Sequence, residues 1–199
     1  MNKVICGTAI SLDNITAGHG MTEEKPFGDM PKNLLHHWMF DEPELHSKEL
    51  AHLSSVAGAY IMGRNMFGPS GPEYDASWEG WWGEEPPYHA PVFVLTHRER
   101  EPITKQGGTT FNFVTDGIHS ALKQAQAVAG DKPIAIAGGA HTINQFLAAN
   151  LIDELWLHVV PVTVGKGIRL FENTPNLHME PIEVSGSNLV THIKYRILR

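Results

Sequence analysis

The chain has 199 residues, 42% of them hydrophobic and 19% charged, with a formal net charge of -7. This length suits one domain over residues 1–199, and a chain of this size buries about 70% of the surface that it would expose when unfolded. The charge argues against a nucleic-acid partner, because binding phosphates over a wide surface needs a surplus of Lys and Arg. An anionic ligand must therefore be held locally, by backbone N–H groups and a few cations.

The N-terminal run M-N-K-V-I-C-G-T-A-I-S is interrupted too early, by Ser11 and Asp13, to be a signal peptide or a membrane span. We therefore expect a cytoplasmic protein that does not bind a membrane, with residues 3–10 as its first strand. Cys6 is the single cysteine, which excludes a disulfide framework and a cysteine zinc site. Its apolar neighbours predict a buried structural thiol.

Residues 11–32 form a long, glycine-containing loop, and a loop of that length in a compact domain is either functional or disordered. Apolar residues at helical spacing predict helices over residues 33–40 and 43–57. A short strand over residues 59–62 ends at Gly63.

Residues 68–91 are rich in Gly, Pro and Trp and show no periodicity, which predicts a second long loop. Trp78, Trp81 and Trp82 either wall a pocket for a flat ring or pack this loop onto the core or a dimer partner. Two further strands are expected after it, one ending in V-F-V-L-T and the next reading T-F-N-F-V-T.

The next helix begins near Asp116, for which this residue or Thr115 is a suitable N-cap, and residues 130–131 end it. A strand of small apolar residues is expected over residues 133–137, followed by a helix over residues 140–149.

A long strand over residues 152–164 precedes two strands, 179–184 and 189–198, that form a closing hairpin. Strands alternate with helices up to this antiparallel section. This order predicts an α/β fold in which helices flank a twisted, mixed, mostly parallel sheet.

The turn I-A-G-G-A-H-T at residues 136–142 follows a buried strand and opens a helix. Gly138 and Gly139 let the backbone approach a ligand closely, the helix N-terminus offers unpaired N–H groups, and Thr142 adds a hydroxyl. These features predict a binding site for the phosphate of a dinucleotide. Two glycines are also compatible with a tight connection that is needed only for packing.

Two other strand ends carry similar chemistry. Gly63 and Arg64 follow one strand, and another ends in Thr96, His97 and Arg98. Ligands of open α/β sheets bind beyond the carboxyl ends of the strands, so the hydroxyls, N–H groups and cations of these three edges form a coherent anion site.

An ordered set of motifs resembles the dihydrofolate-reductase-like superfamily: S-L-D (11–13), M-G-R-N-M-F (62–67), F-V-L-T-H-R (93–98), A-G-G-A-H-T-I (137–143), D-E-L-W-L-H-V-V-P-V (153–162), G-K-G-I-R-L-F (165–171) and T-H-I-K-Y-R (191–196). The chain is most similar to the C-terminal reductase domain of the bifunctional riboflavin-biosynthesis deaminase-reductase and to its stand-alone relatives. The resemblance covers essentially the whole chain. It implies a three-layer fold with a sheet of about eight strands, NADPH as the cofactor, and a homodimer.

The resemblance also assigns the cofactor-binding residues. Ala9 would meet the nicotinamide carboxamide, and Thr96, His97 and Arg98 would surround the adenosine and its 2′-phosphate. The other assigned residues form the two turns over the phosphates, which are Gly63, Arg64, Asn65 and Met66 in one and Gly138, Gly139, Ala140, His141 and Thr142 in the other. In the family, the two glycines of the second turn are joined by a cis peptide bond.

Two departures from the family narrow the expected activity. Asn14 follows S-L-D where the family has glycine, which affects the loop near the nicotinamide. The segment P-K-N-L-L-H-H-W (31–38) has no carboxylate of the kind with which dihydrofolate reductases bind pterins, so folate reduction is not expected. No cluster of extra cations marks a ribosyl-phosphate substrate.

Asp13, at the end of the first strand, is the candidate catalytic residue and would orient the substrate or relay a proton. The alternative is an Asx-turn that organises the loop. His19 is a weaker acid–base candidate. The twelve histidines are scattered, without H-x-x-x-H or H-E-x-x-H spacing on a helix, so no metal site is expected.

We therefore predict an NADPH-dependent reductase that transfers hydride to a C=N or C=O bond of a small heterocyclic or carbonyl substrate. An alternative is an NADPH-binding protein without turnover, such as a sensor. A short-chain dehydrogenase is disfavoured, because the chain lacks G-x-x-x-G-x-G after the first strand and also lacks Tyr-x-x-x-Lys.

Overall fold

The structure is a computed structural model that describes residues 2–71, 74 and 77–199. The strands are β1 (Val4–Ser11), β2 (Ile15–Ala17), β3 (Ala59–Gly63), β4 (Pro91–Leu95), β5 (Ile103–Thr104), β6 (Thr110–Val114), β7 (Ile134–Gly138), β8 (Glu154–Val160), β9 (Ile168–Arg169), β10 (His178–Gly186) and β11 (Thr191–Leu198). The helices are α1 (Trp38–Asp41), α2 (Ser47–Ser54), α3 (Arg64–Phe67), α4 (Ile118–Val128) and α5 (Ala140–Ala148), with a short 3-10 helix, η2 (Gln106–Gly108).

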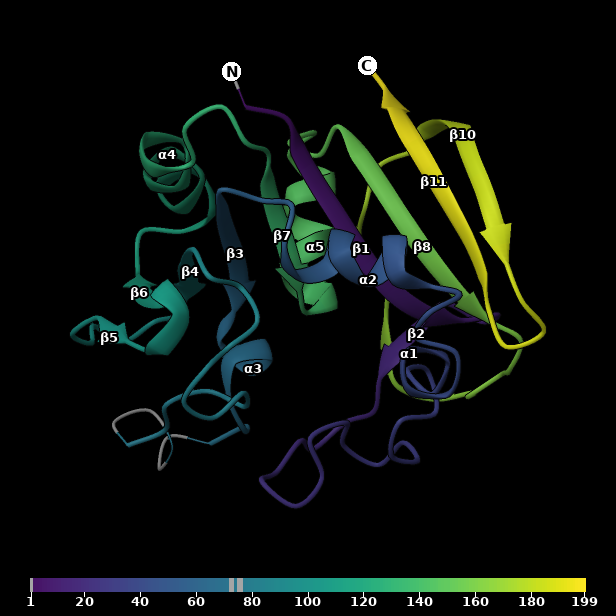
Figure 1. Ribbon diagram of the computed structural model, residues 1–199, viewed down its shortest axis with the longest axis horizontal. Helices are drawn as coiled ribbons and strands as arrows, with labels where there is room; N and C mark the ends of the chain where they lie inside the picture. The colour runs from purple at the N-terminus through teal and green to yellow at the C-terminus, as the bar shows by residue number, and fades with distance from the viewer. Residues whose placement is uncertain (1, 72–73, 75–76) are drawn as a thin grey trace.

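Among the described residues, nine strands form one twisted sheet in the order β10-β11-β8-β1-β7-β3-β4-β6-β5 (Figure 1). The pairs from β8 to β6 across the middle of the sheet are parallel. β11 pairs antiparallel with β8 and β10, and β5 pairs antiparallel with β6. The predicted mixed, mostly parallel sheet with a closing hairpin is confirmed.

The sheet buries both of its faces. Helices α4 and α5 cover one face, and their apolar side chains pack with alternate residues of the central strands, such as Ile61. α1, α2 and the segment before β4 cover the other face, where Tyr60 and Met62 point. Successive residues of a strand face opposite sides, so the apolar run of β3 supplies both cores. Cys6 belongs to the first core, where burial raises the pKa of its thiol to about 12, and it forms no disulfide.

The first long loop is more ordered than the sequence predicts. Residues 15–17 form β2, which pairs antiparallel with β9 from the G-K-G-I-R-L-F motif. Strands of two or three residues are too short to show periodicity, so sequence analysis missed both. β5, in the turn before β6, was missed for the same reason.

The two helices predicted before β3 are shorter than expected. The segment from residue 33 runs as turns, with Asn33 in the left-handed conformation at a φ of 60°, and the helix begins only at Trp38. The predicted helix over residues 43–57 is limited to α2, and the apolar residues Leu45 and Val56, which lie outside α2, are exposed.

The start of α4 also differs from the prediction. Its N-cap is Gly117, with a φ of 83°, and neither Thr115 nor Asp116 caps it. Its end is as predicted, because Gly130 follows with a φ of 59°, the left-handed conformation that stops many helices. The long strand predicted over residues 152–164 is confined to β8.

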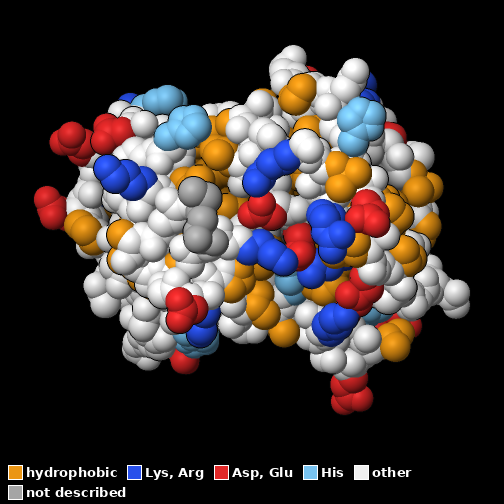
Figure 2. All heavy atoms as spheres, turned by 90° about the horizontal axis from the view of Figure 1, so that it is seen from above, with side chains coloured by type: hydrophobic (Ala, Val, Ile, Leu, Met, Phe, Trp, Pro, Cys, Tyr) orange, Lys and Arg blue, Asp and Glu red, His pale blue; other side chains and the backbone are white. Residues whose placement is uncertain are grey.

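The end of the molecule where the two termini lie carries acidic and basic side chains side by side (Figures 1 and 2). Ion pairs account for this mixture, among them Lys3 with Glu154 and Arg199 with Asp153. That face therefore presents no extended basic surface. Within the described part of the chain, no helix is long and apolar enough to cross a membrane.

Candidate functional site

A cleft of about 1170 Å³ opens beside the carboxyl ends of β3, β4 and β7, on the side of the sheet that α1 and α2 cover. All of the predicted cofactor-binding residues line it: Ala9, Gly63, Arg64, Asn65, Met66, Thr96, His97, Arg98, Gly138, Gly139, Ala140, His141 and Thr142. The three strand ends singled out from the sequence are therefore neighbours in space.

One end of the cleft, here called the glycine-turn end, is formed by Gly138 to Thr142 with Gly63 and Arg64 opposite. Gly138 ends β7 with a φ of 115°, a conformation that side chains disfavour, and the peptide bond to Gly139 is cis, as the resemblance implied. Gly139 is the N-cap of α5. The backbone N–H groups of the first helical turn have no partner within the helix and lie beside the cleft, as an anion site requires.

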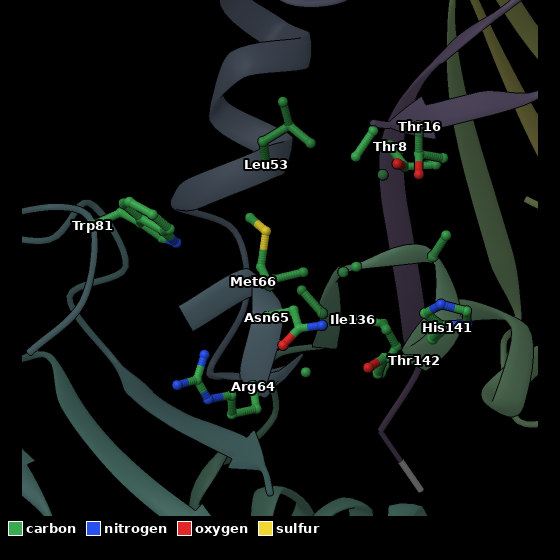
Figure 3. A pocket seen from close by; sticks show the side chains of 18 of the residues that line it. Thr8, Thr16, Leu53, Arg64, Asn65, Met66, Trp81, Ile136, His141 and Thr142 are labelled. Carbon is green, nitrogen blue, oxygen red and sulfur yellow. The ribbon is translucent and has the colours of Figure 1, made fainter. Parts of the chain in front are cut away.

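The two turns at this end approach each other closely. β3 and β7 are adjacent parallel strands, with Met62 opposite Gly138. A methyl group on Gly63 would lie 2.5 Å from Oγ1 of Thr142, so glycine is required here to bring α3 against α5. Figure 3 shows Arg64 and Asn65 of α3 beside Thr142, with Leu53 and Thr8 at the opposite end of the cleft.

The charge of the lining is opposite to that of the whole chain. Among the described residues that line the cleft, the Lys, Arg, Asp and Glu side chains are limited to Arg64 and Arg98. The guanidinium of Arg64 donates to the carbonyl oxygens of Gly68 and Pro69, and to that of Gly71 at 2.9 Å, and so also holds the start of the second loop.

The three loop tryptophans differ in position: two line the cleft, and one packs the loop onto the core. Trp81 and Trp82 line the cleft, and Trp82 also stacks on Phe111 of the core. Trp78 packs the loop down instead, because its indole N–H donates to the carbonyl of Phe67 at 3.1 Å.

The other end, here called the histidine end, is lined by His36, His52 and His158. Sequence analysis did not assign any of the three to the site. Buried ring nitrogens without a hydrogen-bond partner occur on each: Nδ1 of His36, Nδ1 of His52 and Nε2 of His158. Burial lowers the pKa of His36 and of His52 to about 4 and that of His158 well below its usual value, so all three rings are uncharged at neutral pH.

Asp13, the predicted catalytic residue, does not line the cleft. Its carboxylate accepts hydrogen bonds from the Ser11 hydroxyl at 2.6 Å and from the N–H groups of Val164 and Gly165 at 3.0 and 2.7 Å. These bonds, with that of Ser11 first, lower the pKa of Asp13 to about 2. This geometry matches the loop-organising alternative. His19 also lies outside the cleft and is exposed.

A cluster that the sequence spacing did not reveal lies behind the histidine end. Within the described residues, ring nitrogens of His46 and His192 and a carboxylate oxygen of Glu49 lie within 4.8 Å of one another, and all three residues are buried. The histidines are hydrogen-bonded to each other, and Glu49 accepts from the Ser185 hydroxyl, so the cluster is satisfied without an ion. His46 and His192 are far apart in sequence, and only the fold brings them together, with His46 as the N-cap of α2 and His192 on β11.

Comparisons with known proteins agree with this geometry. A family model of the RibD C-terminal domain matches residues 2–191. The uncharacterized protein YwjB of Bacillus subtilis (strain 168) is 36% identical over 64 residues, which cover 32% of this chain and only 36% of YwjB.

Two solved structures share the fold along nearly their whole length. A putative riboflavin biosynthesis protein from Shewanella sp. PV-4 has a TM-score of 0.63 at 22% identity, with 100% of both chains covered. Dihydrofolate reductase from Enterococcus faecalis, in complex with NADP(H), has a TM-score of 0.53 at 16% identity, with 98% of this chain and 96% of the reductase covered. The three-layer, dihydrofolate-reductase-like fold is thereby confirmed.

Proposed function

Because the chain belongs to the RibD C-terminal domain family, we propose that it is an NADPH-dependent reductase that transfers hydride to a C=N or C=O bond of a small heterocyclic or carbonyl substrate. One observation carries the proposal: a single cleft gathers the N-terminus of α5, two arginines and the ends of three strands. In a chain with a net charge of -7, this local concentration of cations and N–H groups suits the phosphates of a dinucleotide.

The cleft is large enough for two ligands. Sites for small molecules are typically about 300–1,000 Å³, and this cleft measures about 1170 Å³. The phosphates would lie at the glycine-turn end and the nicotinamide near Ala9, which leaves the histidine end for the substrate. When bound, NADPH supplies the hydride, and the chain supplies orientation and the electrostatic environment.

The selection of NADPH over NADH is assigned to Arg64 and Arg98. Both line the glycine-turn end, where Thr96 and His97 complete the surface for the adenosine. A guanidinium forms paired hydrogen bonds with a phosphate, and NADH lacks the 2′-phosphate. Arg64 is also bonded to loop carbonyls, so Arg98 is the better single position at which to test the choice.

The chemistry of the histidine end supports one class of substrate. Its rings are uncharged, and each has a buried nitrogen without a hydrogen-bond partner that can accept or donate one hydrogen bond. No Asp, Glu or Lys is among the described lining residues, so neither a cationic pterin nor a phosphorylated sugar has a matching partner at this end. We assign to it an uncharged heterocycle or carbonyl compound with its own N–H or C=O groups, in van der Waals contact with Leu53 and Trp81.

The test begins with binding. Calorimetric titration should give tighter binding of NADPH than of NADH, and failure of both to bind would overturn the proposal. The protein loaded with NADPH is then offered imines, aldehydes, pyrimidinones and pterins, and oxidation is followed by the loss of nicotinamide absorbance. Turnover of an uncharged compound supports the reductase, whereas binding without turnover across the whole set favours a sensor.

A homodimer is also part of the proposal. β10 forms an edge of the sheet, and Ile182 and Val184 on it and Leu198 on β11 are exposed. An open strand edge with apolar side chains favours pairing with a second copy. Light scattering after size-exclusion chromatography, at several protein concentrations, decides between a dimer and a monomer.

A further inference from the structure

The segment G-W-W-G at residues 80–83 places two neighbouring indoles in different surroundings. Trp82 packs on the core, where it stacks on Phe111 with an angle of 17° between the rings. Trp81 lines the cleft and is partly exposed. Among the described residues, it belongs to none of the three hydrophobic cores. Trp81 therefore contributes little to the packing of the fold, and its side chain is available to a ligand.

One buried amine holds this segment from both of its ends. Nζ of Lys105 lies 2.6 Å from a carboxylate oxygen of Glu79 and 3.4 Å from a carboxylate oxygen of Glu84. The side chain of Lys105 is only 5% exposed, whereas both carboxylates are mostly exposed. The hydrogen bond to Glu79 raises the pKa of Lys105, so the buried amine stays charged. A buried charge is costly unless it is paired, so these two ion pairs fix the segment between residues 79 and 84.

The backbone adds to this restraint. The N–H of Gln106 donates to the carbonyl of Glu84 at 2.9 Å. Gly80 and Gly83 have φ values of 101° and 66°, which side chains disfavour, so the chain turns on either side of the two tryptophans. The indole of Trp81 is therefore presented to the cleft by a preorganised turn, which lowers the cost of ordering it when a ligand binds.

Two apolar side chains share this part of the cleft with Trp81. Figure 3 shows the indole and the side chains of Met66 and Leu53 pointing into the same space. Leu53 also lies next to β1, because a methyl group on Gly7 would be 2.9 Å from its Cδ2 atom. Gly7 and Ala9 point to the same side of the sheet, as alternate residues of a strand do, and Ala9 is assigned to the nicotinamide. The space beside Trp81 therefore adjoins the place of the reacting bond.

We propose that Leu53, Met66 and Trp81 form a subsite, here called the ring subsite, for an aromatic ring of the substrate that is fused to the ring holding the reducible bond. Lys105 is proposed to position Trp81, through which it acts. This inference rests on the proposed function and narrows its substrate class to uncharged bicyclic heteroaromatic compounds. None of the three side chains is charged, and an indole face gives a planar ring a large, rigid contact area.

The adenine of NADPH is the other flat ring that this indole would suit. The adenosine is assigned to Thr96, His97 and Arg98 at the end of β4, whereas Trp81 points into the space that it shares with Leu53 of α2 (Figure 3). We therefore assign the ring subsite to the substrate. The affinity of Trp81 variants for the nucleotide separates the two occupants.

The test uses two probes that differ by one ring. Quinoxalin-2-one and pyrazin-2-one share the same C=N, N–H and C=O groups, and only the first has a fused benzene ring. Both are titrated calorimetrically into the protein saturated with NADP⁺, which has no hydride to transfer, so binding is measured without turnover. Quinoxalin-2-one should bind to the wild type about tenfold more tightly or better, the usual gain from stacking a ring on an aromatic side chain.

Variants of Trp81 separate stacking from a general preference of the cleft for larger compounds. Trp81→Ala should lower the ratio of the two affinities by about tenfold, and Trp81→Phe should keep most of it, because a phenyl face remains. Phe40→Ala is the control, since it removes an exposed aromatic side chain outside the cleft. All three variants should bind NADP⁺ as the wild type does, and Trp81→Ala should melt within about 2 °C of it.

Lys105→Met tests the positioning role with the same ratio of affinities. It removes the charge that holds Glu79 and Glu84, so the ratio should fall by about 2- to 10-fold, the usual cost of ordering a side chain on binding, with NADP⁺ affinity unchanged. Lys105→Arg keeps the charge and should keep most of the ratio. Lys48→Met is the matched control, because it removes a lysine from an ion pair with Glu183 elsewhere on the surface. If Lys105→Met does not fold, Glu79→Gln weakens the same ion pair from its exposed side and is measured instead.

Several outcomes would overturn the inference. A wild-type ratio near one, or the same ratio in wild type and Trp81→Ala, would exclude the ring subsite, and a loss of NADP⁺ affinity in Trp81→Ala would assign the indole to the adenine. In protein that already carries Trp81→Ala, Lys105→Met should not change the ratio further, and an additional loss there would exclude the positioning role.

These outcomes leave the proposed reductase standing as long as NADPH binds. If neither NADPH nor NADP⁺ binds, the proposed function fails, and the same titrations of the nucleotide-free protein still decide whether the ring subsite exists.

Discussion

Gly63 and Thr142 meet where two turns of the cleft come together, and a methyl group on Gly63 would lie 2.5 Å from the Thr142 hydroxyl oxygen. Thr142 is buried in the first turn of α5, and Gly63 is the N-cap of α3. Any side chain at position 63 must therefore separate two helix N-termini that the proposed function assigns to one pyrophosphate.

Gly63→Ala should lower the free energy of unfolding by about 1–3 kcal/mol, the usual cost of overpacking. It should also weaken NADPH binding by about tenfold. Adding Thr142→Ala removes the clashing atom, so the double variant should recover much of the lost stability. Urea unfolding of both variants and of Thr142→Ala alone gives the coupling. Simple addition of the two single effects would contradict the contact.

Arg98→Ala tests the choice of cofactor. Loss of a charge-assisted bond of about 1.5–3 kcal/mol should weaken NADPH binding by about 10- to 100-fold and leave NADH binding within about threefold. Arg196→Ala is the matched control, because it removes the same charge from an exposed pair with Glu180. Calorimetry with both nucleotides measures the affinities of Arg98→Ala and Arg196→Ala, each compared with that of the wild type. Equal losses for NADPH and NADH in Arg98→Ala would show that Arg98 does not recognise the 2′-phosphate.

Asp13→Asn tests the role that the structure gives to this residue. An amide accepts hydrogen bonds on one oxygen only, so the bonds to Val164 and Gly165 cannot both be kept as they are. The pKa of Asp13 is lowered to about 2, below its unfolded value of about 3.9. Its contribution to stability is therefore full above pH 4 and is lost as the pH falls toward 2.

Unfolding of wild type and Asp13→Asn should accordingly differ most above pH 4, and the difference should shrink toward pH 2. NADPH binding and hydride transfer should stay within about threefold of wild type, because the carboxylate lies outside the cleft. A loss of hydride transfer of 10²-fold or more with unchanged stability would restore Asp13 as the catalytic residue.

Much of the fold follows from the sequence because the central strands are long apolar runs. The glycine-turn end was predicted for a related reason, since its residues lie within three short, contiguous motifs that the parallel strands carry to one edge. The histidine end was not, because His36, His52 and His158 come from three separate elements and meet only through packing.

The same limit applies to Asp13 and to the hydrogen-bonded pair of His158 and His192. The residue type and position of Asp13 fit both catalysis and a loop-organising turn, and only the N–H groups of residues 164–165 distinguish them. His192 lies 34 residues from its partner His158 and on another strand. This contact cannot be predicted from the spacing of the two residues in the sequence, because it depends on the register of β8 and β11.

The uncharged histidines also predict how stability depends on pH. The pKa values of His36 and His52 in the folded protein are about 4, against about 6.5 in an unfolded chain, and those of His158 and His192 are lowered too. Between pH 7 and 5 the unfolded state therefore binds more protons than the folded state, and the protein should lose stability as the pH falls through 6.5. Carboxylates contribute little in this window, because the shifted Asp and Glu pKa values lie below it.

Each such histidine contributes a slope of at most about 1.4 kcal/mol per pH unit. Urea unfolding at intervals from pH 7.5 to pH 5 measures this slope. His36→Asn should reduce the slope by up to about 1.4 kcal/mol per pH unit, the contribution of one histidine. The difference in slope between wild type and variant should vanish above pH 7, where both states are unprotonated. An unfolding free energy that is constant from pH 7 to pH 5 would mean that these rings accept protons as readily in the fold as outside it. The histidine end would then be cationic below neutral pH and would suit an anionic substrate instead of an uncharged one.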